Sequence, residues 1–277
     1  MTVRLPAVAG SFYPGKEETL REQLDALIPA ARKERALALI APHAGYAYSG
    51  RVAGAVYGRV EVPRDVVILC FNHHGAGRDF AVWPEGAWRT PLGDAPVNRE
   101  LAASIKQAFL SADFDESGHE DEHSAEVHVP FLQRVRPDVR IAPVALSVGH
   151  DEKSVAQLRA FGKALAGLSA DALAKAEAAE GFLVVASTDL NHYEDQKTTV
   201  QKDEAVIRAI EALDDRALLE TIQAREVSMC GFAPTIATIA YAKARGATNV
   251  STVAHATSGD VSGDYDRVVG YVGMVIS

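Results

Sequence analysis

The stretch DVVILCFNHHGAG, from Asp65 to Gly77, joins an apolar run to a pair of histidines. Its first half, DVVILCF, is a short apolar run, which is typical of a strand buried on both faces in a parallel sheet. Its second half places two histidines and two glycines directly after that strand. Neighbouring side chains on an extended backbone point to opposite sides, so we expect at most one of His73 and His74 to bind a metal.

Similar patterns recur along the chain. Apolar runs predict further buried strands at 36–42, 139–146 and 182–187. Helical periodicity predicts helices at 17–31, 98–110, 154–168, 202–213, 215–224 and 234–245, and the Ala-rich segment 169–181 is expected to be an exposed helix end and a connection. The glycine-interrupted segments 249–257 and 267–277 are expected to be antiparallel edge strands. This order predicts one α/β domain over residues 1–277, with a layered α/β/α architecture and a central mixed, mostly parallel sheet.

Composition excludes several classes of protein. The chain has 277 residues, 48% of them hydrophobic, and a formal net charge of -9. The acidic balance argues against a nucleic-acid partner, because phosphates would be repelled. We find neither a signal peptide nor an apolar run of about 18 residues that could cross a membrane, so we expect a cytoplasmic protein. Two cysteines are too few for a disulfide framework.

Histidines follow three of the predicted strands. His43 comes just after the first strand, His73 and His74 after the second, and His192 after the strand at 182–187. A single loop histidine is usually a solvated or capping residue. Ligands of open α/β sheets, however, bind at the carboxyl ends of the strands, and all of these positions lie at that edge. The pattern therefore predicts a shared metal or catalytic site.

The two cysteines are expected to differ in role. Neutral imidazole and thiolate suit iron, copper or zinc, whereas magnesium and calcium prefer oxygen ligands. Cys230 precedes a predicted helix, whose positive N-terminus would favour a thiolate, so Cys230 is a candidate ligand; the alternative is a small buried residue near a turn. Cys70 lies within the strand itself and is expected to be a buried apolar residue.

The segment EDEHSAEVHVPFLQ, residues 120–133, adds further polar groups. Ser124 could cap a helix that begins there. His123 and His128 are five residues apart, so they do not share a helix face in the way that an i, i+4 metal-binding pair does. We expect Glu122, His123 and Glu126 to line the site or to support it through hydrogen bonds.

Several sequence blocks in a fixed order carry a family resemblance. They are PAVAGSFYP (6–14), APHAGYAYSG (41–50), NHHG (72–75), RTPLGD (89–94), DEHSAEVHVPFLQ (121–133), STDLNHY (187–193) and CG (230–231). Together they resemble the Memo family, the B component of the AmmeMemoRadiSam system. The fold of that family is similar to that of the class III extradiol (LigB-type) dioxygenases, so a LigB-like fold is implied for the whole chain.

The resemblance also implies a site. Its metal ligands would be His43, His73 and Cys230, and its acid/base residue would be His192, with Asp189 in the same motif. The dioxygenases use a carboxylate where this chain has Cys230. A thiolate makes the site softer and shifts its preference from a ferrous triad toward copper or zinc. His74 would then point away, into supporting hydrogen bonds or the pocket wall.

Three functional hypotheses follow. The leading one is a metal-dependent redox or oxygenase-like enzyme that acts on a small molecule and uses one divalent or redox metal ion, iron or copper. The second is a binding module for a peptide or protein partner, with aromatic anchors at Phe12, Tyr13, Tyr46, Tyr48 and Trp88. The third is a zinc hydrolase. The resemblance further implies a radical SAM enzyme and an AMMECR-type protein as partners.

Overall fold

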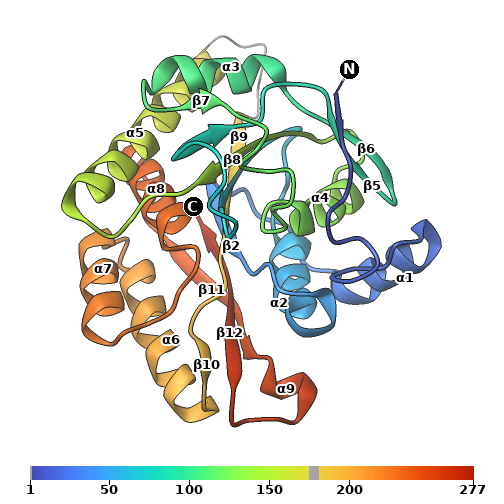
Figure 1. The fold of residues 1–277 in the computed structure, drawn as a ribbon, viewed down its shortest axis with the longest axis vertical. Coiled ribbons are helices and arrows are strands. Elements are labelled where there is room, and N and C mark those ends of the chain that lie inside the picture. Colours follow the sequence, from blue (N-terminus) through green and yellow to red (C-terminus); the bar gives the residue numbers. More distant parts are fainter. Residues whose placement is uncertain (1, 175–180) are drawn as a thin grey trace.

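A mixed sheet forms the centre of the protein. The computed structural model describes residues 2–174 and 181–277. Within them, the strands follow the order β10-β12-β2-β9-β3-β8-β4-β7, with β11 beside β12 (Figure 1). The strands are β2 (Ala38–Ala41), β3 (Asp65–Phe71), β4 (Phe80–Val82), β7 (Asp113–Phe114), β8 (Arg140–Leu146), β9 (Phe182–Ser187), β10 (His192–Glu194), β11 (Val250–Thr257) and β12 (Val268–Ile276).

The four central strands β2, β9, β3 and β8 are parallel, as the continuous apolar runs predict. All of β3 pairs with β8, so that Asp65 lies opposite Arg140 and Phe71 opposite Leu146. Because these strands run in one direction, the loops that follow β2, β3 and β9 emerge at the same edge of the sheet. The predicted α/β fold with a mixed sheet is therefore confirmed.

The flanks of the sheet are antiparallel. On one flank β12 pairs with β2, and β11 pairs with β12. On the other flank β4 pairs with β8. The prediction that segment 267–277 forms an edge strand is wrong, because β12 lies between β2 and β11. Its nearly continuous burial is that of an interior strand.

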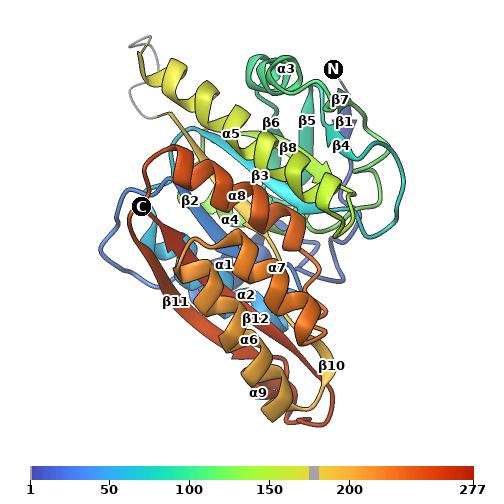
Figure 2. The ribbon, with the colours of Figure 1, turned by 90° about the vertical axis from the view of Figure 1, so that its left-hand side faces the viewer.

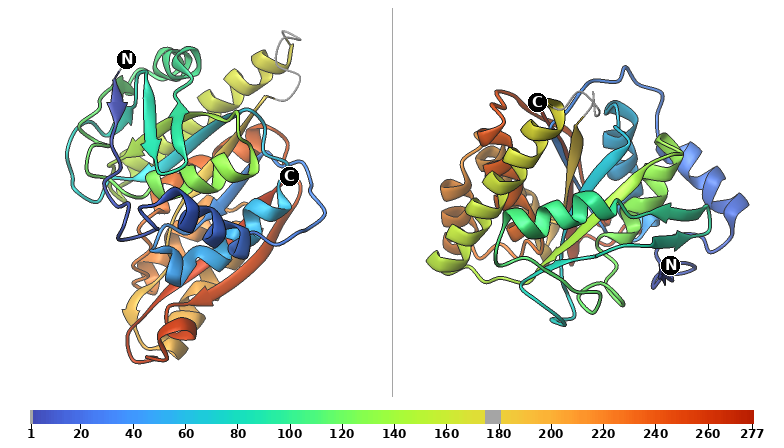
Figure 3. Two further views of the ribbon diagram at one scale, coloured as in Figure 1. Left: turned by 90° about the vertical axis from the view of Figure 1, so that its right-hand side faces the viewer. Right: turned by 90° about the horizontal axis from the view of Figure 1, so that it is seen from above.

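Helices cover both faces of the sheet. One face packs against α3 (Arg99–Ala108), α5 (Glu152–Ala174), α6 (Gln196–Glu211), α7 (Asp215–Ala224) and α8 (Phe232–Ala244), most of which lie in front in Figure 2. The opposite face packs against α1 (Glu17–Leu27), α2 (Tyr46–Arg59) and α4 (Val129–Val135), which Figure 3 shows from their own side. Side chains of β3 alternate between these two cores: Val67 and Leu69 join the first, and Val66, Ile68 and Cys70 join the second. Cys70 is thus the buried apolar residue that was predicted.

Some helices begin or end at other residues than predicted. Helix α1 ends at Leu27 rather than at residue 31, because Pro29 disfavours helical backbone in the residue before it. Helix α5 extends to Ala174, and residues 175–180 of the Ala-rich segment lie outside the described residues. Ser124 does not cap a helix: its hydroxyl donates to the carbonyl of Phe71, and a short 3-10 turn (Glu126–His128) precedes α4.

Helix α2 was not predicted, because glycine is a poor helix former. Gly50, Gly54 and Gly58 recur at four-residue spacing and so lie on one face of the helix. A Cβ atom at Gly54 would lie 2.1 Å from the backbone oxygen of Leu27. The glycines therefore let the end of α1 and the chain that follows it pack directly against the backbone of α2.

A smaller sheet stands beside the main one. It consists of β1 (Val3–Arg4), β5 (Ala87–Thr90) and β6 (Gly93–Pro96), in the order β1-β5-β6. A single turn, α9 (Gly259–Ser262), follows β11. Among the described residues, no helix combines the length and apolar composition that crossing a bilayer requires. The assignment of residues 1–277 to one domain stays a prediction.

Candidate metal centre

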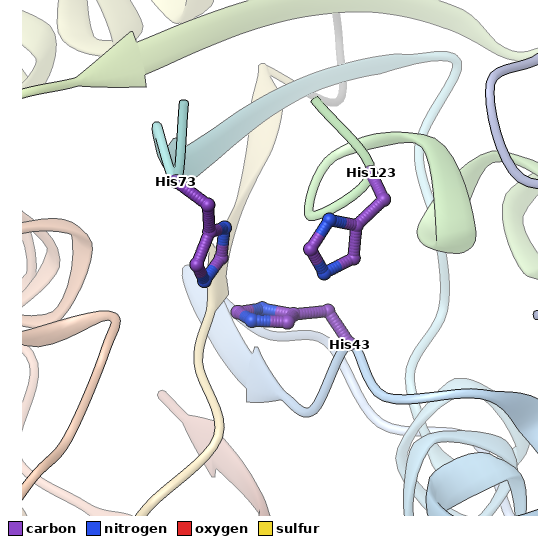
Figure 4. A group of neighbouring side chains, drawn as sticks. All are labelled: His43, His73 and His123. Carbon is purple, nitrogen blue, oxygen red and sulfur yellow. The ribbon is translucent and has the colours of Figure 1, made fainter. Parts of the chain in front are cut away.

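Three imidazole rings meet at the carboxyl edge of the parallel strands. His43 follows β2, His73 follows β3, and His123 comes from the loop before the 3-10 turn. One potential ligand atom of each lies within 4.8 Å of the others, and Figure 4 shows the rings gathered around a common space. The ring centroids are 5.2 Å apart for His43 and His73, 5.4 Å for His43 and His123, and 4.8 Å for His73 and His123.

Glu122 orients the ring of His73. Its Oε1 lies 3.0 Å from His73 Nδ1 and 2.8 Å from the backbone N–H of Ser124. Burial raises the pKa of Glu122, but the hydrogen bond and charge of His73, together with the Ser124 N–H, outweigh it and lower the pKa to about 2. An ionised carboxylate only accepts hydrogen bonds, so His73 Nδ1 carries a proton, and in the neutral ring Nε2 keeps its lone pair.

His123 was expected to line or support the site, but its ring belongs to the three-histidine group itself. Its Nδ1 is 3.3 Å from Glu122 Oε1, and its ring also packs against Phe12, with centroids 4.8 Å apart. His74 belongs instead to a second, more exposed group with Glu122 and His123. The structure thus places His73 beside His43 and directs His74 elsewhere.

Cys230 contacts His43 but lies outside the three-histidine group. Its Sγ is 3.3 Å from His43 Nε2 and 3.3 Å from the backbone N–H of Asp189. Burial, followed by the charge of Asp189, raises the pKa of the Cys230 thiol. These two effects oppose the thiolate stabilisation that we expected from the N-terminus of α8. A bound cation would act in the opposite sense and favour the thiolate.

Asp189 connects the loops after β2 and β9. Its Oδ1 accepts a hydrogen bond of 2.9 Å from the backbone N–H of His43, and its Oδ2 lies 3.9 Å from His43 Nε2. Burial raises the pKa of Asp189 to about 7, although the backbone hydrogen bonds from His43 and Ala44 act against this. Asp189 is therefore a carboxyl group that can exchange a proton near neutral pH.

His192 is held by Ser228. The backbone carbonyl of Ser228 lies 2.8 Å from His192 Nδ1, and the Ser228 hydroxyl accepts the His192 backbone N–H at 2.8 Å. A carbonyl can only accept, so Nδ1 carries a proton, and in the neutral ring Nε2 keeps the lone pair that can accept one. Burial lowers the pKa of His192. His192 therefore has the protonation pattern of a general base.

Glu126 supports the site indirectly by fastening the N-terminal segment over it. Its carboxylate forms a buried ion pair of 2.7 Å with Arg4 and accepts hydrogen bonds from the Tyr13 hydroxyl and the Ala7 backbone N–H. This brings Phe12 onto the ring of His123. Glu126 thus builds one wall of the site without facing its centre.

The predicted aromatic anchors lie mostly in the core. Tyr13, Tyr46 and Trp88 are each no more than 3% exposed, and the Tyr46 hydroxyl donates to the carbonyl of Val127. Tyr48, in the first turn of α2, is 46% exposed. Tyr46 therefore supports the wall, and Tyr48 is the one of these four that offers an exposed aromatic face.

Two residues of the site were not singled out from the sequence. Ser187, the last residue of β9, lies 2.7 Å from His43 Nδ1, and His128 lies 2.9 Å from Ser187. Both are fully buried. The available signal was a hydroxyl at the end of a strand that leads into STDLNHY, the same edge that holds the histidines.

Comparisons with known proteins identify a family and a shared fold. The model of a family described as "Memo-like protein" matches residues 4–275. A "MEMO1 family protein" of Thermotoga maritima is 42% identical, over 99% of both chains. Similar relatives occur in Methanopyrus kandleri (40% identical, 98% of both chains) and Aquifex aeolicus (38%, 99% of both chains). An uncharacterized protein from Escherichia coli K12 shares the fold, with a TM-score of 0.55, 14% identity, and coverage of 86% of this chain and 98% of that one.

Proposed function

The chain belongs to the Memo-like protein family, and we propose on this basis that it binds one transition-metal ion through His43, His73 and Cys230. The observation that carries the proposal is the convergence of three imidazoles with ligand atoms within 4.8 Å, beside a thiol that lies 3.3 Å from His43 Nε2. Nitrogen and sulfur donors of this kind fit iron, copper or zinc.

The protonation of the donors supports the fit. A metal ligand must offer a lone pair, so a histidine ligand must be neutral. Burial lowers the pKa of His43, and the charges of His123 and His73 lower it further. Glu122 already holds the Nδ1 proton of His73. Both rings are thus prepared to donate from Nε2.

His123 is the competing third ligand. It belongs to the three-histidine group, whose ligand atoms lie within 4.8 Å of one another, whereas Cys230 lies outside that group with its Sγ 3.3 Å from His43 Nε2. We assign the third position to Cys230 because its Sγ lies 3.3 Å from His43 Nε2. The contact of Glu122 with His123 Nδ1 leaves His123 Nε2 available as the alternative donor. Parallel variants of the two residues separate these assignments.

The chemistry that we propose is redox or oxygenase-like turnover of a small substrate. Bound iron or copper would supply electron transfer and oxygen chemistry. His192 Nε2 would accept the substrate proton, because Ser228 fixes the other proton of His192 at Nδ1. Asp189, with a pKa of about 7 and in contact with His43, is the alternative acceptor of that proton. The segment fastened by Glu126 would limit the access of water from the side of His123.

Anaerobic titration with iron(II) and with copper(I) tests this proposal. We expect one ion per chain in the wild type and loss of binding in a His43→Ala, Cys230→Ala double variant. Binding should be unchanged in the control His150→Phe, which removes an exposed imidazole outside both groups and keeps an aromatic ring against Phe232. Full stoichiometry in the double variant would overturn the proposal. Cys230→Ser and His123→Gln then identify the third ligand, which is the residue whose loss weakens binding more.

The metal found in the purified protein distinguishes the zinc hydrolase. Zinc that activates water would use Asp189 as the proton acceptor, and the pKa of about 7 of Asp189 suits that role. Iron or copper in protein purified without added metal favours the redox proposal. The binding-module hypothesis is weaker, because Tyr13, Tyr46 and Trp88 are buried. A radical SAM enzyme and an AMMECR-type protein remain proposed partners on the strength of family membership.

A further inference from the structure

We infer that Ser187 is a positioning residue that fixes the proton of His43 on Nδ1 and so reserves Nε2 for the metal, with His128 completing the arrangement. The role in metal binding rests on the proposed function, whereas the position of the proton does not.

Three polar atoms surround the Ser187 hydroxyl. The carbonyl oxygen of Ser124 lies 2.6 Å from Ser187 Oγ, His43 Nδ1 lies 2.7 Å away, and His128 Nε2 lies 2.9 Å away. Ser187, Ser124 and His128 are fully buried, and His43 is 2% exposed. A serine hydroxyl has one proton to donate and two lone pairs that accept. Its capacity is thus matched by its three neighbours.

The Ser124 carbonyl decides how these bonds are arranged. A carbonyl oxygen can only accept, so the Ser187 proton points at Ser124. Ser187 Oγ then has only lone pairs left, and both histidine nitrogens must donate to it. His43 is therefore protonated on Nδ1, and the lone pair of Nε2 faces the Cys230 thiol at 3.3 Å.

His128 can only donate to Ser187, which fixes the direction of this hydrogen bond. Its Nδ1 lies 3.1 Å from the Tyr57 hydroxyl, which donates to it because Nε2 already carries the proton of the neutral ring. Burial lowers the pKa of His128 to about 3, so the ring stays neutral. The His128 Nε2–H therefore donates to the second lone pair of Ser187 Oγ, and the first is left for His43 Nδ1–H.

The opposite arrangement is disfavoured. If Ser187 donated to His43 instead, the buried Ser124 carbonyl would lose its proton donor. An orphaned buried acceptor shifts such an equilibrium by about tenfold or more. Glu122 does for His73 what Ser187 does for His43, so the two proposed ligands are held by different chemistry: a carboxylate for one and a shared hydroxyl for the other.

Nitrogen-15 NMR of the metal-free protein tests where the proton lies. Long-range proton–nitrogen correlations of the imidazole rings report which nitrogen is protonated. We expect His43 to be protonated on Nδ1 in the wild type and to populate Nε2–H at least about tenfold more in Ser187→Ala. Ser187→Thr restores the hydroxyl and should restore the wild-type spectrum.

Ser124→Ala is the matched control. It is the same change at a neighbouring buried serine, but it removes only the hydroxyl that donates to Phe71 and leaves the Ser124 carbonyl in place. The His43 spectrum should therefore keep its wild-type form. If Ser187→Ala does not fold, Ser187→Cys carries the same test, since a thiol is a weak acceptor.

Metal affinity supplies the second measurement. Loss of an orienting partner typically weakens metal binding by about 10- to 100-fold, and we expect this for Ser187→Ala but not for Ser187→Thr or Ser124→Ala. His43 protonated on Nε2 in the wild type, or a His43 spectrum unchanged in Ser187→Ala, would overturn the inference. If the wild type binds no metal, the proposed function fails while the spectra still decide the position of the proton.

Discussion

Gly162 controls the contact between α5 and α8. A Cβ atom at Gly162 would lie 2.2 Å from the backbone oxygen of Ala237 and 2.8 Å from Ala240 Cβ, both in α8. Replacing a helical glycine with alanine contributes about 1 kcal/mol of helix propensity, whereas overpacking costs about 1–3 kcal/mol and occasionally more. The clash is with backbone, which cannot rotate away. We therefore expect Gly162→Ala to lower the free energy of unfolding by up to about 2 kcal/mol.

The same helix contains the control. A Cβ atom at Gly167 meets no atom within 4 Å, so Gly167→Ala should raise the free energy of unfolding by about 1 kcal/mol. Urea unfolding followed by circular dichroism measures both changes. Because α8 begins at Phe232, two residues after Cys230, Gly162→Ala should also weaken metal binding while Gly167→Ala should not. Equal or greater stability of Gly162→Ala relative to Gly167→Ala would refute this reasoning.

Three further predictions concern buried carboxylates. Because the pKa of Asp189 is raised to about 7, its contribution to stability is complete below about pH 4 and is lost as the pH rises through 7. Between pH 4 and pH 8 the metal-free wild type should lose up to about 4 kcal/mol of unfolding free energy through this group, as urea unfolding at both pH values would measure, and Asp189→Asn should not. The lowered pKa of Glu122, about 2, places its contribution above pH 4.5, so acid titration of stability from pH 5 to pH 2 should cost the wild type up to about 3 kcal/mol more than Glu122→Gln. Glu126→Gln breaks the buried ion pair with Arg4 and should lower the free energy of unfolding by about 3–5 kcal/mol, measured with urea, while Glu17→Gln, in an exposed pair, should lower it by less than about 1 kcal/mol. Equal losses would show that burial does not determine the contribution of the ion pair to stability.

The sequence predicted the elements whose patterns are governed by burial. Strand β3 was found with its observed bounds, Asp65–Phe71, because a parallel strand covered on both faces must be apolar throughout. The positions of His43 and His73 at one edge followed from the shared direction of these strands. Helix α7 was likewise found with its observed bounds, because it combines an aspartate at its start with an apolar stripe on one face.

What could not be predicted depends on contacts between distant residues. Helix α2 was missed because its glycines are favourable only against the backbone that follows α1. His123 was expected to support the site, since nothing local shows that its ring would stand beside that of His43. The role of Ser187 depends on a carbonyl 63 residues away in the chain. Neither periodicity nor spacing contains such information.

The position of β12 has a consequence for how the protein folds. One edge of β2 pairs with β9, and at the other edge residues 38–40 pair with residues 274–276 of β12. This second edge has no partner until nearly the whole chain has left the ribosome. Contacts this remote in sequence make folding slow, and an open strand edge invites association between chains. We therefore expect chains that stop before Val268 to aggregate during synthesis even though every residue of the metal centre is already present.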